Sequence, residues 1–125
     1  MKRMIIILAA AAALAGCGSP SSKLYTLSST KSCLAAAKLP LRPATDFVAT
    51  TSTGGSTRAI FPTNSVTLVF GLTQSDADNI NAAYQRFHGA NVGIADVLRQ
   101  DRNAVMLWKF HPADKDAALL TGCLS

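Results

Sequence analysis

An apolar run of eleven residues near the start of the chain limits how much of the sequence can take part in a fold. Met4 to Leu14 are all apolar, and Lys2 and Arg3 precede them. A membrane-spanning helix needs about 20 apolar residues to cross about 30 Å of hydrocarbon, so this run is too short to span a bilayer. Basic residues, an apolar run and then small residues, in this order, are typical of an export signal that is removed from the mature protein. The fold must therefore be built from the residues that follow.

The four residues that end this segment, Leu14-Ala15-Gly16-Cys17, resemble the lipobox of bacterial lipoprotein precursors at every position. The resemblance implies a signal peptide over residues 1–16, cleavage between Gly16 and Cys17, and a diacylglycerol group on the sulfur of Cys17. It also implies a fatty acyl group, such as palmitate, on the new amino terminus. The alternative is an ordinary secretory signal cleaved after Ala15 or Gly16, in which Cys17 is incidental.

The resemblance also implies a location. Two or three acyl chains hold a protein to a bilayer far more firmly than one chain does. Gly18 follows Cys17, whereas an Asp at this place commonly retains a lipoprotein in the inner membrane of a host that has two membranes. We therefore expect a lipid anchor in the cell membrane or outer membrane, with the domain outside the cytoplasm. Residues 17–29 are rich in Ser, Gly and Pro and are predicted to form a flexible tether.

Once Cys17 carries lipid, Cys33 and Cys123 are the cysteines that remain. Disulfides persist in the compartments that exported proteins occupy. Two remaining cysteines in an exported chain therefore indicate one bridge between them. Closing a loop of about 90 residues is worth about 4–5 kcal/mol in the chain-entropy model. The alternative is two buried free thiols. The chain contains no Cys-x-x-Cys motif, so a thioredoxin-like activity is not expected.

The charge of the mature chain argues against a nucleic-acid partner. Removing Lys2 and Arg3 lowers the formal net charge of +5 by two, to +3. The remaining basic residues are scattered singly along the chain, with no basic run that would track a phosphate backbone.

Residues 30–125 are long enough for one small disulfide-linked domain. Residues 46–51 fit a short strand or a helical turn, and this choice stays open. Asp101-Arg102-Asn103 has the composition of a turn. The other predicted elements are a helix over 31–38, a hairpin of strands 57–61 and 65–71, a helix over 74–88, a helical turn over 94–98, a strand over 104–110 and a final helix from about 113 to 122.

This order of elements predicts an α+β fold: a small two-layer sandwich of an antiparallel or mixed sheet with helices on one face. Strand 65–71 carries apolar residues on both faces, which indicates a central strand. With helix 74–88 and strand 104–110 it would form a crossover unit. A ferredoxin-like arrangement is our first choice, and a shuffled α+β layout is the alternative.

The sequence offers no recognisable catalytic or metal site. His88 and His111 are too few to form a zinc site, because the cysteines are expected in the bridge. No Gly-x-Ser-x-Gly motif is present. The acidic pairs Asp76 with Asp78 and Asp114 with Asp116 are two residues apart and do not face each other on a helix. We therefore predict no catalytic residues, no metal and no cofactor.

A binding patch is predicted around Trp108, the aromatic residue whose N–H most needs a partner. Lys109 and His111 follow it closely, and Arg99 and Arg102 precede its strand. Core packing of Trp108, with these charges scattered over a solvated surface, is the favoured interpretation, and the binding patch is the alternative to it. Residues 102–108, with Pro112 and Gly122-Cys123-Leu124, are similar to small uncharacterised exported proteins of high-GC bacteria, a resemblance that carries no activity.

These expectations favour a membrane-anchored, non-enzymatic binding or adaptor module of the cell envelope. Its expected partners are the membrane, through the lipid anchor, and a protein of the envelope. One alternative is a periplasmic enzyme inhibitor or small-ligand carrier with a rigid loop or an apolar pocket near Trp108. Another is an enzyme whose site residues are gathered only in three dimensions.

Overall fold

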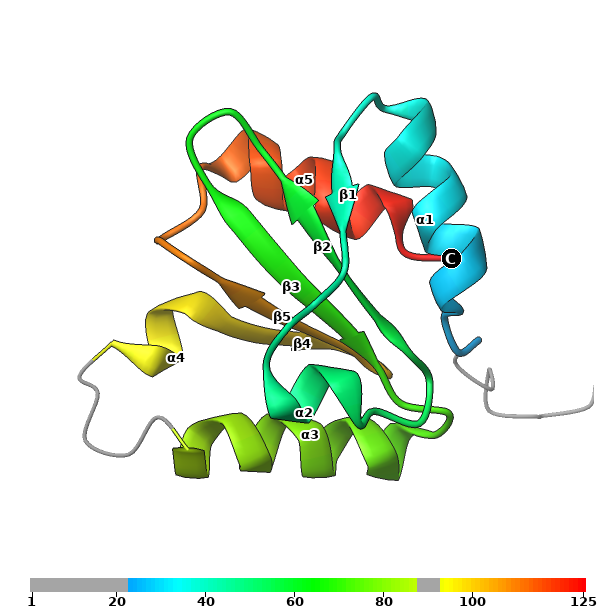
Figure 1. The fold of residues 1–125 in the computed structure, drawn as a ribbon, viewed down its shortest axis with the longest axis vertical. Coiled ribbons are helices and arrows are strands. Elements are labelled where there is room, and N and C mark those ends of the chain that lie inside the picture. The colour runs from blue at the N-terminus through cyan, green and yellow to red at the C-terminus, as the bar shows by residue number, and fades with distance from the viewer. Residues whose placement is uncertain (1–22, 88–92) are drawn as a thin grey trace, which may run out of the picture.

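In the computed structural model, which describes residues 23–87 and 93–125, five strands form one sheet in the order β1-β2-β3-β5-β4 (Figure 1). Every neighbouring pair of strands is antiparallel. The predicted signal peptide, Cys17 and His88 lie outside the described residues. The strands are β1 (Leu41–Arg42), β2 (Ser56–Ile60), β3 (Ser65–Phe70), β4 (Leu98–Asp101) and β5 (Ala104–Trp108), and the helices are α1 (Leu27–Ala36), α2 (Phe47–Thr50), α3 (Gln74–Phe87), α4 (Ile94–Val97) and α5 (Asp114–Cys123).

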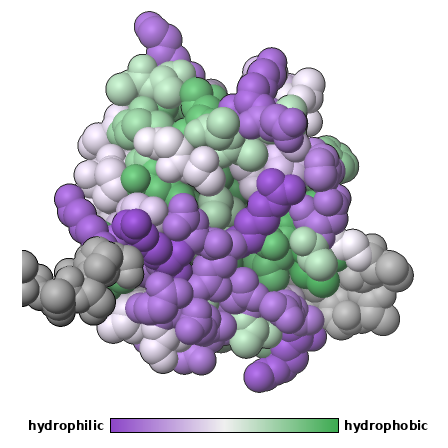
Figure 2. Space-filling view, turned by 180° about the vertical axis from the view of Figure 1, so that it is seen from behind, coloured by the Kyte–Doolittle hydropathy of each residue, from purple (hydrophilic) through white to green (hydrophobic). Residues whose placement is uncertain are grey.

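Helices cover both faces of the sheet, because its central strands are apolar on both sides. In β3, Leu68 packs with α1 and α5, whereas Val69 packs with α2 and α3. Figure 1 shows α5 behind the sheet and α3 across one end of it. The predicted α+β sandwich is confirmed, with the correction that the helices lie on two faces and not on one. Seen from the α5 side, hydrophilic and apolar residues are interspersed on the surface (Figure 2).

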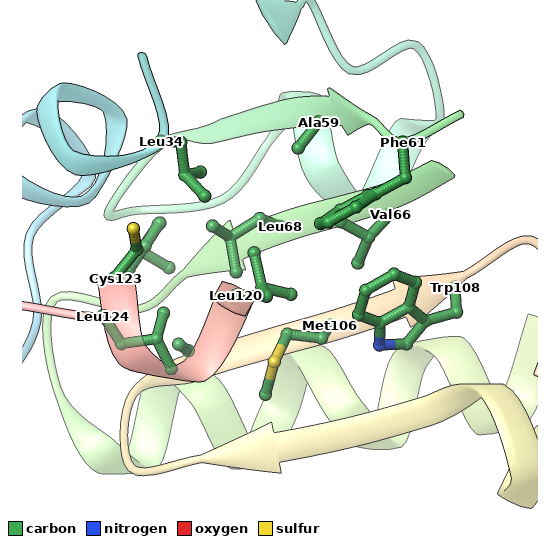
Figure 3. Packing of buried hydrophobic residues seen from close by; sticks show 12 residues of the cluster. Leu34, Ala59, Phe61, Val66, Leu68, Met106, Trp108, Leu120, Cys123 and Leu124 are labelled. Atoms are coloured by element: carbon green, nitrogen blue, oxygen red, sulfur yellow. The ribbon is translucent and has the colours of Figure 1, made fainter. Parts of the chain in front are cut away.

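The larger core lies between the sheet and the pair α1 and α5 (Figure 3). Leu34 from α1 and Leu120 from α5 are fully buried against Leu68. The predicted bridge is confirmed: Cys33 in α1 and Cys123 at the end of α5 form a disulfide with their Cα atoms 5.3 Å apart. The bridge therefore joins the first and last helices above the sheet.

The smaller core lies on the other face, between the sheet and α2 and α3. Tyr84 of α3 is 2% exposed, and its hydroxyl donates to the Asp46 carboxylate at 2.9 Å. The same carboxylate accepts the Ala49 N–H at 2.8 Å and so caps α2. Burial, followed by the charge and hydrogen bond of Asp46, raises the pKa of Tyr84 above its usual value. The open choice over residues 46–51 is resolved as a capped helical turn.

The ordered domain includes part of the predicted tether. The Tyr25 N–H donates to the side-chain oxygen of Asn103 at 2.7 Å. The amide of Asn103 donates in turn to the carbonyls of Tyr25 and Gly71, each at 2.8 Å. Asn103 is 1% exposed and has little access to solvent, so these hydrogen bonds satisfy the polar atoms of its side chain. Helix α1 begins at Leu27, four residues before its predicted start, and residues 23–29 therefore belong to the fold.

The predicted crossover between strands 65–71 and 104–110 is wrong. Strand β4 was not predicted, because Arg99 and Gln100 give this short edge strand little apolar pattern. The chain leaves α4, enters β4 and reverses at Arg102, whose φ of 51° suits the predicted turn. This reversal sets β5 antiparallel to β3. The strand order β1-β2-β3-β5-β4 places β5 between β3 and β4 but no strand between β1 and β2, and so it differs from the ferredoxin-like order. The hairpin β2–β3 and the final helix agree with the prediction.

Replacing either bridged cysteine should lower stability by the same amount. We expect Cys33→Ser and Cys123→Ser each to cost about 4–5 kcal/mol on the chain-entropy estimate, because either change opens the same loop. The double variant should be no less stable than the single ones. Thermal unfolding of the purified proteins measures all three, and widely different single variants would show that one cysteine contributes something other than the bridge.

Candidate functional site

Helices α2 and α3 leave one end of their face of the sheet uncovered, and a cavity of about 800 Å³ opens there. We call this cavity the sheet trough. Figure 1 looks onto this face of the sheet. The residues that matter below are Arg58 and Ile60 of β2, Thr67 of β3, Leu107 of β5, Lys109 directly after it, and Ile94 and Val97 of α4.

Strand register places the floor of the sheet trough. Arg58 is directly opposite Thr67, which is directly opposite Leu107, so the three side chains form a row across three strands. Ile60 and Ser65 form the next row toward the β2–β3 turn. The Lys109 N–H donates to the Ser65 carbonyl at 2.9 Å, which adds Lys109 to this second row.

The sheet trough is cationic. Arg58 and Lys109 line it, and none of the seven acidic residues of the chain does. Arg42 of β1 is directly opposite Arg58, on the same face of the sheet. The Nε atom of Arg58 is buried and has no hydrogen-bond partner among the described residues. The fold thus holds a partly buried guanidinium beside a second one, without a carboxylate between them.

The five residues of the predicted binding patch do not lie on one surface. The side chain of Trp108 is 2% exposed and packs on the opposite face of the sheet, with its ring centroid 5.3 Å from that of Phe61 (Figure 3). Arg99 is opposite Met106 on that same face. Arg102 lies over the Tyr25 ring at 5.3 Å, in the β4–β5 turn. Of the five, Trp108 and Lys109 line the sheet trough, and Lys109 lies on the face of the sheet where it opens.

His111, the remaining residue of that patch, pairs with Asp96 of α4. Its Nδ1 lies 2.6 Å from an Asp96 carboxylate oxygen, and the two side chains are 63% and 52% exposed. An aspartate and the histidine that it orients are two of the three members of a hydrolytic triad. In residues 23–87 and 93–125, however, no serine, threonine or cysteine side chain hydrogen-bonds to the His111 ring. The pair therefore connects α4 to the segment after β5.

Two smaller hollows lie elsewhere. A groove of about 240 Å³ separates α2 from α3, and Phe47 and Phe87, which are 73% and 68% exposed, line it. A hollow of about 270 Å³ reaches the edge of Trp108 between β5 and α5, beside Arg99 and Ala117. Neither has the density of unpaired charge found in the sheet trough.

No family model matches the sequence, and no curated protein or solved structure matches it either. Within the described ranges, no three His, Cys, Asp or Glu side chains lie close enough to hold a metal ion. No helix in this part of the chain is long and apolar enough to cross a membrane.

Sequence reasoning missed most of the sheet trough. Arg58 alternates with the buried Thr57 and Ala59, so its placement on the second face could have been predicted from the period of a strand. What could not be predicted is that α2 and α3 cover only one end of that face. That depends on β4 and the position of α4, whose sequences give weak patterns.

The charge of Arg58 should lower the stability of the free domain. Directly opposed like charges cost roughly 0.2–1 kcal/mol, so Arg58→Met and Arg42→Met should each raise the free energy of unfolding by up to about 1 kcal/mol. Because both relieve one repulsion, the double variant should gain less than the sum. Urea unfolding at low salt measures this, with Lys31→Met on the exposed side of α1 as the control. Additive gains would mean that the two arginines do not interact.

Proposed function

We propose that the protein is a membrane-anchored lipoprotein of the cell envelope, and that its domain is a non-catalytic binding module which uses the sheet trough. The observation that carries the binding proposal is a concave, cationic surface that no acidic residue of the chain neutralises. Charges that the fold leaves uncompensated at a concave site are typical of ligand recognition.

The chemistry of the sheet trough supports binding over catalysis. Arg58, Lys109 and the hydroxyl of Thr67 can donate hydrogen bonds to an anion. Among residues 23–87 and 93–125, no imidazole or carboxylate lines the sheet trough, so the described lining offers no group suited to act as a general base at neutral pH. The hollow volume of about 800 Å³ specifically favours a small molecule as the ligand, which makes a small-ligand carrier the second candidate.

The position of the first described residues supports close anchoring. Six residue steps separate Cys17 from Lys23, and they reach at most about 20 Å when fully extended. Arg102 donates to the Lys23 carbonyl at 3.1 Å, and the Arg102 carbonyl accepts from Gln74 at the start of α3. A lipid on Cys17 would thus keep this end of α3 near the bilayer. The sheet trough opens at the other end of the sheet, beyond Thr67 and Leu107.

Removing the predicted lipidation site should release the protein. In cells that produce the Cys17→Ala variant, we expect an uncleaved precursor and loss of the mature, membrane-bound form, because both cleavage and anchoring need the thiol. Ser19→Ala is the matched control and should be processed normally. Membrane fractionation with immunoblotting measures both. Normal processing and full membrane retention of Cys17→Ala would contradict the anchor.

A photo-crosslinking amino acid in place of Thr67 should capture the ligand of the sheet trough in living cells. The same amino acid in place of Ala118, which is exposed on α5, is the control. We expect one molecular species to be attached at position 67 and absent at position 118, as identified by mass spectrometry of the purified protein. No adduct at position 67, or the same adducts at both positions, would contradict a binding role for the sheet trough.

A further inference from the structure

We infer that the sheet trough binds an amphiphile with one anionic head group, a carboxylate or a phosphate, and a short apolar body. The inference rests on the proposed binding function and names the ligand class of that site. The head group lies at Arg58, and the apolar body lies against Leu107 and α4.

The floor of the sheet trough changes from charged to apolar along one row of side chains. The register places Arg42, Arg58, Thr67, Leu107 and Leu98 in line across the five strands. Neighbouring strands are about 4.8 Å apart, so the guanidinium-bearing position on β2 is about 10 Å from the leucine on β5. A ligand that lies along this row meets cations first, then a hydroxyl, then hydrocarbon.

The charged end is suited to a single oxyanion. A guanidinium binds a carboxylate or phosphate through two parallel hydrogen bonds, and Arg58 lines the sheet trough with no acidic side chain beside it. Arg42, directly opposite Arg58, adds positive charge at this end. Lys109 lies in the next row on the β5 side, two strands from Arg58. An anion bound here would offset the repulsion between the two arginines.

The opposite end is suited to hydrocarbon. Ile94 and Val97 of α4 are half-buried and form the wall beside Leu107, which is also half-buried. Phe110, at 57% exposure, stands at the rim with the Lys109 Nζ 5.3 Å from its ring centroid. Apolar side chains left half-covered in a concave wall gain free energy when a ligand completes their burial.

The size and shape of the site favour one small molecule. The volume of about 800 Å³ falls within the range of about 300–1,000 Å³ that is usual for small-molecule pockets. Arg58 lies in a hollow, so a flat bilayer surface would not reach it together with the wall of α4. An acidic peptide would need a series of cations along its length, and in the row of Arg58 the positions beyond Thr67 are leucines.

Octanoate, octyl phosphate and 1-octanol are the probes that test this ligand class. They share an apolar chain and differ in the head group, and acetate and inorganic phosphate carry the head groups without the chain. The processed lipoprotein is reconstituted in phosphatidylcholine nanodiscs, and radiolabelled probe is measured by equilibrium dialysis against empty nanodiscs. We expect saturable binding of one octanoate or octyl phosphate per protein, and the tighter of the two identifies the head group as carboxylate or phosphate.

Removing the cations should weaken this binding by at least about tenfold, since charge-assisted hydrogen bonds are lost. Arg58→Met tests the head-group site directly. Lys109→Met removes the cation on the β5 side, at an exposed side chain whose loss leaves the core intact, and should weaken binding less than Arg58→Met does. Arg86→Met, at the exposed end of α3, is the matched control and should bind as the parent does. Binding should also weaken as salt is raised.

Each contrary result has a distinct meaning. Equal binding of 1-octanol would overturn the anionic head group, and equal binding of acetate or phosphate would overturn the apolar body. If no probe binds while the crosslinker at position 67 still captures a molecule, the ligand class is wrong and the binding function stands. If neither experiment detects a ligand, both proposals fail.

Discussion

The pairing of β3 with β5 is the constraint on which the rest of the structure depends. Both strands are apolar on both faces, with Leu68 opposite Met106 on one side and Val69 opposite Val105 on the other. A strand pair of this kind is stable only when each face is covered. The chain covers one face with the bridged helices α1 and α5 and the other face with α2 and α3. The remaining strands flank this central pair in the sheet.

The two covers differ in extent, and this difference produces the site. Helices α1 and α5 cover a core that extends from Phe70 at one end of the sheet to Trp108 at the other. On the second face, the core residues Val69, Tyr84 and Val105 lie at one end, and the four-residue helix α4 alone borders the remainder. Where the cover stops, β3 changes from Val69 to Thr67, Arg58 is the position of β2 opposite Thr67, and β5 continues from Val105 through Leu107 to Lys109. The change in residue type and the end of the helical cover therefore fall at the same place on this face of the sheet.

The strong patterns of the sequence predicted the elements that follow a single physical rule. The hairpin at 57–71, the amphipathic helix 74–87 and the bridge between Cys33 and Cys123 follow from strand alternation, helical spacing and the redox compartment. The topology could not be predicted in the same way, because β4 is short and polar and one turn at Arg102 decides whether β5 runs parallel or antiparallel to β3. The residues of the candidate patch are divided between surfaces for a related reason. Trp108 and Lys109 are neighbours in sequence, and a strand sends neighbours to opposite faces.

The pair Arg42 and Arg58 is difficult to explain as part of the scaffold. Surface arginines are usually unremarkable, but here two of them face each other across adjacent strands, and the Nε of one is buried without an acceptor. Each condition costs free energy, and a leucine or threonine at either position would suit the sheet better. Nothing else in the described part of the domain recovers that cost, since no acidic side chain lines the sheet trough. An anionic ligand in the sheet trough supplies the missing negative charge, which is the physical argument for placing the function of the domain at this end of the sheet.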